Sequence, residues 1–93
     1  MKYKIIPTSL FKRELRKMQR RGLPLEDLDD VVAKLANDET LEEKHRDHPL
    51  LGKYLGYREC PIHPDQLLIY RKEADALVLV LSRTGTHSDL FKK

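Results

Sequence analysis

The stretch QLLIYRKEADALVLVLSR, residues 66–83, decides the fold, because it holds two long apolar runs around one short polar turn. Residues 66–72 and 76–83 are rich in Leu, Ile, Val and Tyr, whereas the turn at residues 72–75 carries three charged side chains. Two such runs predict an antiparallel pair of strands. Residues 77–81 are apolar at every position, which favours a central strand covered on both faces.

Two further runs extend this pair. GYREC, residues 56–60, comes before it and predicts a third strand of the same antiparallel meander. KYKII, residues 2–6, alternates polar and apolar side chains and is followed by Pro7, as a first strand would be. The chain therefore begins with one strand and ends with three.

The segment after the first strand predicts two amphipathic helices. Residues 8–9 can cap the first helix, in which Phe11, Leu15 and Met18 recur at helical spacing. Apolar residues recur again over residues 25–35, where acidic side chains occupy the outer face of a second helix.

This order predicts a single α+β domain over residues 1–93, with the N-terminal strand and two helices packed on one face of an antiparallel sheet. The other face would stay open. Because sheets twist, that face would form a shallow concavity, into which the loop around His48 and residues 83–91 could both project. This concavity is the candidate functional site.

The net charge of +3 hides an uneven distribution of charge. Residues 1–22 hold eight Lys or Arg and one acid, residues 23–43 hold eight acids and one Lys, and the remainder holds nine bases and six acids. The first helix therefore predicts a basic surface for a polyanion, although two solvated helix faces would give the same pattern. The cations that would contact RNA phosphates are Lys12, Arg13, Arg16, Lys17, Arg20 and Arg21.

Composition excludes several classes of protein. The single cysteine, Cys60, excludes an internal disulfide and is expected to be a small core residue. No apolar run reaches the roughly 18 residues of a membrane-spanning helix, and the N-terminal residues lack a secretory signal. We therefore expect a cytoplasmic protein with no membrane partner. His45, in the charged run EEKHRD, is expected to be solvated.

The polar residues near the predicted concavity favour metal-free RNA cleavage. That reaction needs a group to remove the 2′-OH proton, a group to protonate the departing 5′ oxygen, and a cation for the charge on phosphorus. Histidines, with an ordinary pKa of about 6.5, can share both proton transfers, and an aromatic ring can hold an unstacked base. The histidines lack a tight metal-ligand spacing, so neither a metal nor another cofactor is predicted.

Three segments resemble a known family. DHPLLGKYLGYREC (47–60), PDQLLIYR (64–71) and RTGTHSDLF (83–91) resemble the YafQ branch of the RelE superfamily of bacterial toxins. The resemblance implies a microbial-RNase-like α+β fold and a metal-independent endoribonuclease that cuts mRNA in the A site of the ribosome by 2′-OH attack. It also implies a type II toxin-antitoxin system, in which a cognate antitoxin neutralises the toxin.

The same resemblance implies roles for individual residues. His48 and His87 match two active-site histidines, and Asp65 matches an acidic residue that orients groups or transfers a proton. Arg83 matches the phosphate-binding arginine, and Phe91 matches the aromatic ring near the base.

Purely structural interpretations of these residues stay open. Asp65 follows a proline, as turn residues do, and Phe91 could pin the end of the chain. Arg83 could pair with Glu59 across strands, and Arg58 either binds the RNA backbone or forms a surface pair.

One segment departs from the family pattern. Relatives that this chain resembles usually read GYRECHIEPDW, whereas this chain reads GYRECPIHPDQ, so a histidine is missing at Pro61 and another stands at His63. A shift of two residues along a strand keeps a side chain on the same face but moves it by roughly 6.6 Å. A bend between Pro61 and Pro64 would let His63 replace the missing group. Otherwise cleavage would be weaker, or the chain would be a silent module that binds nucleic acid and antitoxin.

Overall fold

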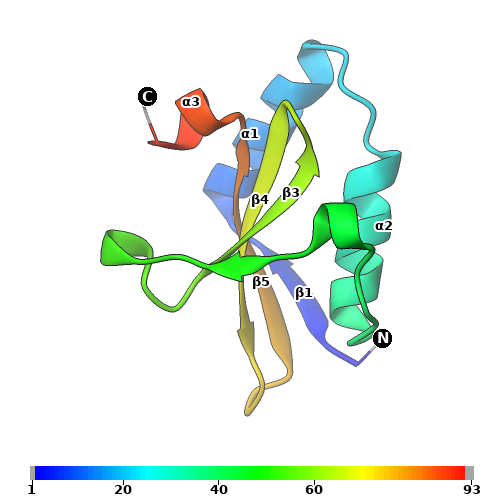
Figure 1. The fold of residues 1–93 in the computed structure, drawn as a ribbon, viewed down its shortest axis with the longest axis vertical. Coiled ribbons are helices and arrows are strands. Elements are labelled where there is room, and N and C mark those ends of the chain that lie inside the picture. The colour runs from blue at the N-terminus through cyan, green and yellow to red at the C-terminus, as the bar shows by residue number, and fades with distance from the viewer. Residues whose placement is uncertain (1, 92–93) are drawn as a thin grey trace.

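The computed structural model describes residues 2–91, which form a five-stranded sheet covered by helices (Figure 1). The elements in chain order are β1 (Lys4–Pro7), α1 (Ser9–Arg20), α2 (Glu26–Ala36), the 3₁₀ turn η1 (Glu43–His45), β2 (His48–Pro49), the 3₁₀ turn η2 (Gly52–Tyr54), β3 (Arg58–His63), β4 (Gln66–Glu73), β5 (Val78–Gly85) and α3 (His87–Phe91). The strand order is β1-β5-β4-β3-β2, and the predicted α+β class is confirmed. No helix within residues 2–91 has both the length and the apolar character needed to cross a membrane.

The sheet is mixed rather than purely antiparallel. β3, β4 and β5 form the predicted antiparallel meander, whereas β1 pairs with β5 in parallel. Most of the chain, including α1 and α2, separates β1 from β5, and a long connection of this kind is what allows two neighbouring strands to run in the same direction. The first strand also begins at Lys4, two residues later than predicted.

Both long helices bury their apolar sides against one face of the sheet, which we call the helix face. Phe11 of α1 and Val31 of α2 pack there with Leu68 and Leu79 of the sheet. The hydroxyl of Thr8 caps α1 by accepting a hydrogen bond of 2.9 Å from the backbone N–H of Phe11. Full burial of one large apolar side chain stabilises a fold by about 1.5–3 kcal/mol, so this cluster is the main source of stability.

The opposite face, which we call the second face, is less open than predicted. Leu67 and Ile69 of β4 are buried on it beneath Leu90 of α3. Partly buried side chains from the loop after β2 and from α3 pack around them, namely Leu50, Tyr54, Tyr57 and Phe91. Successive side chains of a strand point to opposite faces, which is why β4 contributes to both clusters.

A bulge in β5 determines the direction of Arg83. Arg83 lies opposite Ile69, whereas Leu81 lies opposite Tyr70, so Ser82 is an extra residue in β5. Directly opposite residues share a face of the sheet, and Ile69 belongs to the second face. Regular alternation from Leu81 would have turned Arg83 toward the helices, and the bulge turns it to the second face instead.

A second bulge, in β3, determines the direction of His63. Pro61 lies opposite Leu67 on the second face, but His63 lies opposite Gln66, so Ile62 is the extra residue. Gln66 precedes Leu67 in β4 and therefore faces the helices, and His63 faces the helices with it. The bend expected near Pro61 is present, but it moves His63 to the other face.

The prediction that His45 is solvated is wrong. Its side chain is buried, and its Nδ1 donates a hydrogen bond of 2.9 Å to the carbonyl oxygen of Pro61. Cys60 is fully buried beside it, as predicted, and its thiol donates to the His45 carbonyl at 2.9 Å. Burial, and then the nearby charge of Asp47, raise the pKa of Cys60 to about 12, so this thiol is a packing group and a poor nucleophile.

Candidate active site

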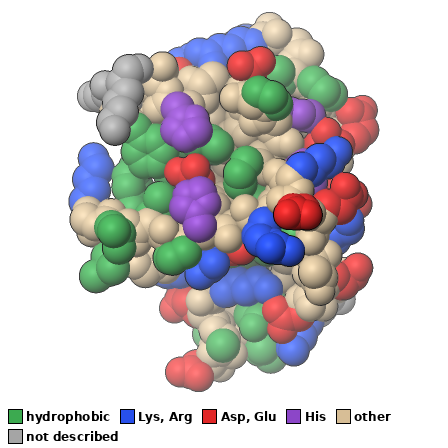
Figure 2. Space-filling view, viewed as in Figure 1, with side chains coloured by type: hydrophobic (Ala, Val, Ile, Leu, Met, Phe, Trp, Pro, Cys, Tyr) green, Lys and Arg blue, Asp and Glu red, His purple; other side chains and the backbone are tan. Residues whose placement is uncertain are grey.

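One buried carboxylate on the second face links two histidines. Glu59 Oε1 lies 3.5 Å from His48 Nε2 and 3.7 Å from His87 Nε2. The Glu59 side chain is only 8% exposed, whereas both imidazoles are more than half exposed. Figure 2 shows two histidine side chains on either side of one acidic side chain, with hydrophobic side chains around them. The structure thus brings together a loop histidine and a C-terminal histidine, and both can reach a ligand from solvent.

Strand pairing places His48 beside Glu59. β2 runs antiparallel to β3, with His48 directly opposite Glu59. The preceding residue, Asp47, points to the helix face, where it accepts a hydrogen bond of 2.5 Å from Arg58 Nε and another from the Tyr70 hydroxyl. This anchor fixes the register of a strand of two residues, and alternation then turns His48 to the second face. Arg58, a predicted RNA contact, therefore lies on the opposite face, bound to Asp47.

A capping box builds α3, which carries His87. The Asp89 carboxylate accepts from the backbone N–H of Thr86 at 3.1 Å, and Thr86 Oγ1 accepts from the backbone N–H of Asp89 at 3.0 Å. A Cβ at Gly85 would lie 3.0 Å from the Cβ of Asp89, so glycine is what lets α3 fold back closely onto β5. A hydrogen bond of 2.9 Å from Arg21, and then the backbone N–H of Thr86, hold the pKa of Asp89 well below its usual range.

Aromatic rings connect the histidines to a neighbouring cavity. The centre of the His87 ring lies 5.9 Å from that of Phe91, and Phe91 meets the Tyr54 ring edge-on at 6.0 Å. The open cavity beside these rings has a volume of about 530 Å³ and is lined by Leu51, Lys53, Tyr54, Arg83, Leu90 and Phe91. Apolar, aromatic and cationic side chains around one cavity suit a nucleobase with an adjoining phosphate.

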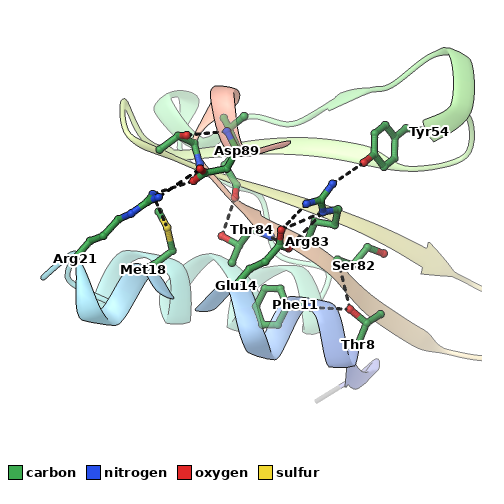
Figure 3. A network of polar contacts seen from close by, with 12 residues as sticks. Thr8, Phe11, Glu14, Met18, Arg21, Tyr54, Ser82, Arg83, Thr84 and Asp89 are labelled. Carbon is green, nitrogen blue, oxygen red and sulfur yellow. Dashed lines mark hydrogen bonds and ion pairs between the residues drawn. The ribbon is translucent and has the colours of Figure 1, made fainter. Parts of the chain in front are cut away.

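Two other elements hold the guanidinium of Arg83 (Figure 3). Its Nη2 and Nε donate to Oε2 of Glu14, in α1, at 2.5 and 3.2 Å, and its Nη1 donates to the Tyr54 hydroxyl at 3.1 Å. The hydrogen bond with Glu14 is the main cause that raises the pKa of Arg83; burial opposes the shift and the Tyr54 contact adds to it. Arg83 therefore pairs with Glu14 rather than with Glu59, whose carboxylate lies beside the two histidines instead.

Two predicted catalytic residues lie outside this cluster. His63 faces α2, where its Nδ1 lies 3.4 Å from Asp27 Oδ2, on the opposite side of the sheet from Glu59. The bulge in β3 thus keeps His63 from taking the place of the histidine that is missing at Pro61. Asp65 is exposed in the turn between β3 and β4, where no described residue forms a hydrogen bond or ion pair with it.

The basic side chains of α1 form a surface next to this site. All five predicted phosphate contacts within the helix are exposed: Lys12, Arg13, Arg16, Lys17 and Arg20. Arg21, just after the helix, binds Asp89. Because Glu14 of the same helix reaches Arg83, which lines the cavity, the basic surface adjoins the cavity.

The arrangement offers proton transfer and anion binding. Two exposed imidazoles share one carboxylate that can orient them, and a nearby guanidinium is fixed in place. Within residues 2–91, no group of three or more His, Cys, Asp or Glu side chains is placed to hold a metal ion.

Sequence patterns left Glu59 ambiguous and gave Glu14 no role. Glu14 is the one acid among the eight cations of residues 1–22, and this isolated position is the sequence feature that could have indicated a role for it. For Glu59, alternation in GYREC places it on the face opposite the core residue Cys60, yet nothing local indicates that two distant histidines meet there.

Known proteins resemble this chain in sequence and in fold. The chain is 37% identical over 82 residues to the mRNA interferase toxin YafQ of Escherichia coli K12, which covers 87% of both proteins. A metal-bound toxin from Helicobacter pylori matches with a TM-score of 0.90 at 37% identity, over 96% of this chain and 99% of that chain. A chain of the E. coli DinJ-YafQ toxin-antitoxin complex matches with a TM-score of 0.85 at 30% identity, over 98% and 99%. Residues 3–92 match the model of the YafQ family, and the chain therefore belongs to this family of bacterial toxins of type II toxin-antitoxin systems.

Proposed function

We propose that this toxin is an endoribonuclease that cleaves mRNA on the ribosome, with histidines as the proton-transfer groups and without a catalytic metal. The observation that supports this most directly is the approach of His48 and His87 to one oxygen of Glu59. The name of the E. coli relative, mRNA interferase toxin, agrees with RNA as the substrate.

The proposed reaction is attack of the 2′-OH on the adjacent phosphorus, which breaks the bond to the 5′ oxygen and leaves a cyclic phosphate. One imidazole accepts the proton of the 2′-OH while the other donates a proton to the 5′ oxygen, and Glu59 orients both rings. Arg83 stabilises the added negative charge on phosphorus, and Phe91 stacks against the base. The exposure of both imidazoles and the cavity beside Phe91 support these roles.

Further partners follow from this function. The exposed cations of α1 would bind ribosomal or messenger RNA phosphates without sequence preference, so activity should fall steeply as salt concentration rises. We propose that a cognate antitoxin silences the chain, since the E. coli relative is found in a toxin-antitoxin complex with DinJ. An acidic antitoxin segment would suit the exposed cations of α1. A protein that works on ribosomes acts in the cytoplasm.

Primer extension on mRNA translated in a cell-free bacterial extract tests the catalytic proposal. Wild-type protein should produce defined breaks within codons, His87→Ala should abolish them, and His48→Ala should weaken them strongly. His63→Ala is the matched control, because His63 also pairs with an acid but on the other face of the sheet. Breaks that persist in both the His48 and the His87 variants would refute histidine catalysis.

Metal independence needs its own test, since the H. pylori relative is described as metal-bound. The assay is repeated with a chelator that removes transition metals but leaves ribosomal Mg²⁺. Unchanged cleavage is expected. Loss of cleavage that added metal restores would overturn this part of the proposal.

A silent binding module is the second candidate, and the proline at position 61 favours it, because relatives this chain resembles usually carry a histidine there. Inducing the protein in bacteria separates the two candidates. Growth arrest that His87→Ala abolishes supports the nuclease, whereas arrest that survives this change supports binding alone.

A further inference from the structure

The one acid of the basic N-terminal segment is turned inward. Glu14 is surrounded in sequence by exposed cations, yet its side chain is only 14% exposed. Besides Arg83, its Oε1 accepts a hydrogen bond of 3.2 Å from the backbone N–H of Thr84. β1 ends at Pro7, opposite Leu81, so the outer edge of β5 beyond that point has no neighbouring strand. Glu14 supplies the acceptor that a strand would otherwise supply.

The contacts of Glu14 fix the plane and the direction of the Arg83 guanidinium. A guanidinium carries five N–H groups in a rigid fork. Glu14 accepts from Nε and from one N–H of Nη2, and Tyr54 accepts from one N–H of Nη1. One N–H on Nη1 and one on Nη2 remain without an acceptor among the described residues. They belong to a side chain that lines the open cavity beside Phe91, where a phosphate could bind.

We propose that Glu14 is a positioning residue for cleavage: it holds Arg83 by one edge of the guanidinium and so presents the remaining N–H groups to the scissile phosphate. The inference rests on the proposed function, since it concerns the same reaction. Among the described residues, Glu14 forms hydrogen bonds with Arg83 and with the backbone of Thr84 and with neither histidine of the site, and its effect on the rate is assigned to Arg83. A fixed guanidinium stabilises charge that develops in the transition state without having to reorganise, which is how such a contact raises a rate.

A positioning role and a purely electrostatic role for Glu14 predict different combinations of RNA binding and cleavage rate. Removing a negative charge from a surface that binds a polyanion should strengthen binding. Removing the group that holds Arg83 should slow the chemical step. Glu14→Gln therefore predicts slower cleavage together with equal or tighter binding, a combination that a purely electrostatic role does not give.

Single-turnover cleavage on mRNA-programmed ribosomes measures both quantities. The maximal rate should fall about tenfold in Glu14→Gln, because small displacements of a catalytic group are costly, while the half-saturating toxin concentration stays equal or falls. In an Arg83→Lys background the same change should cause no further loss, because the two residues act as one unit. Asp38→Asn is the matched control: Asp38 also binds two cations, Lys2 and Lys72, far from Arg83 in the sequence, and asparagine tolerates its positive φ. It should leave the rate unchanged.

Nuclear magnetic resonance of the Arg83 side chain gives a readout that does not require cleavage. The Nε–H signal should exchange slowly and be rigid in the wild type, and should become mobile in Glu14→Gln. A guanidinium as rigid in this variant as in the wild type would overturn the inference, as would an unchanged maximal rate. If His87→Ala cleaves like the wild type while Arg83 loosens in Glu14→Gln, the proposed chemistry fails but the positioning contact stands.

Discussion

Two bulges in the same sheet have opposite effects on the candidate active site. The extra residue Ser82 in β5 turns Arg83 to the second face, where Tyr54 and the cavity lie. The extra residue Ile62 in β3 turns His63 to the helix face, next to Asp27 of α2. Each residue stands directly after the extra residue of its strand, and that extra residue decides which face of the sheet the side chain reaches.

The difference shows that distance along a strand does not predict which polar side chain reaches a site. A one-residue change of register moves every following side chain to the other face. The partners of the two residues reinforce the outcome. Arg83 gains a carboxylate and a hydroxyl, whereas His63 Nε2 is buried without a hydrogen-bond partner among the described residues.

The largest expected effect is that of Arg83→Ala, which removes the side chain that the β5 bulge delivers. Loss of a preorganised group that stabilises transition-state charge costs about 10²–10³ in rate. We expect a decrease of that size in primer-extension breaks, with the protein still folded by circular dichroism. A decrease of only a few-fold would contradict a catalytic role for Arg83 and for the bulge that turns it to the second face.

The next effect is a gain, from Pro61→His. Position 61 lies opposite Leu67 on the second face, two residues along β3 from Glu59, so a histidine there points to the site side of the bulge. An added proton-transfer group should raise the cleavage rate by about tenfold in the same assay. Adding His63→Ala should leave that gain intact. A gain that disappears in the double variant would place His63 in the mechanism after all.

A smaller effect is expected from Asp89→Asn, which weakens the attachment of α3 to the end of β5. Because Arg21 and the backbone of Thr86 lower the pKa of Asp89, its ionised form stabilises the fold at pH values above the unfolded-state pKa of about 3.9. The change should lower the free energy of unfolding by about 1 kcal/mol at pH 7. Urea unfolding should show this difference shrinking as the pH falls below about 4, through the lowered pKa of the folded state. A difference that stays constant down to the lowest pH would contradict the assignment.

The smallest effect on cleavage is expected from His63→Ala. Its partner is a half-exposed carboxylate of α2, and such pairs contribute about 0–1 kcal/mol to stability. We expect cleavage within about twofold of wild type and a loss of stability below about 1 kcal/mol. A large loss of cleavage with normal stability would show that His63 takes part in the reaction, although the bulge in β3 turns it to the helix face.

Much of the fold could be predicted because it depends on local patterns. The meander follows from apolar runs separated by turns, and the start of α1 follows from Thr8 as its cap. The parallel pairing of β1 with β5 could not be predicted, because it depends on how the helices pack on the sheet and not on the sequence of the strand itself. The burial of His45 could not be predicted for a related reason. Its neighbours in the sequence are charged, but its own side chain packs against β3, where it meets the carbonyl oxygen of Pro61.

The candidate site, too, could be predicted only in part. The residue types and the resemblance identified His48, Arg83, His87 and Phe91, to which we assign the proposed chemistry. The role of Glu59 between two histidines and the hold of Glu14 on Arg83 depend on residues far apart in the chain. Contacts of that kind leave no periodic signal in the sequence.

The sequence by itself determined the two long helices and four of the five strands, the residues that could transfer protons, and the family that the chain resembles, because these depend on side-chain chemistry and short-range spacing. Only the tertiary structure decided which of those residues meet. The reason is physical: single extra residues in β3 and β5 reverse the direction of the side chains that follow, and pairing with neighbouring strands and helices fixes where those residues are placed.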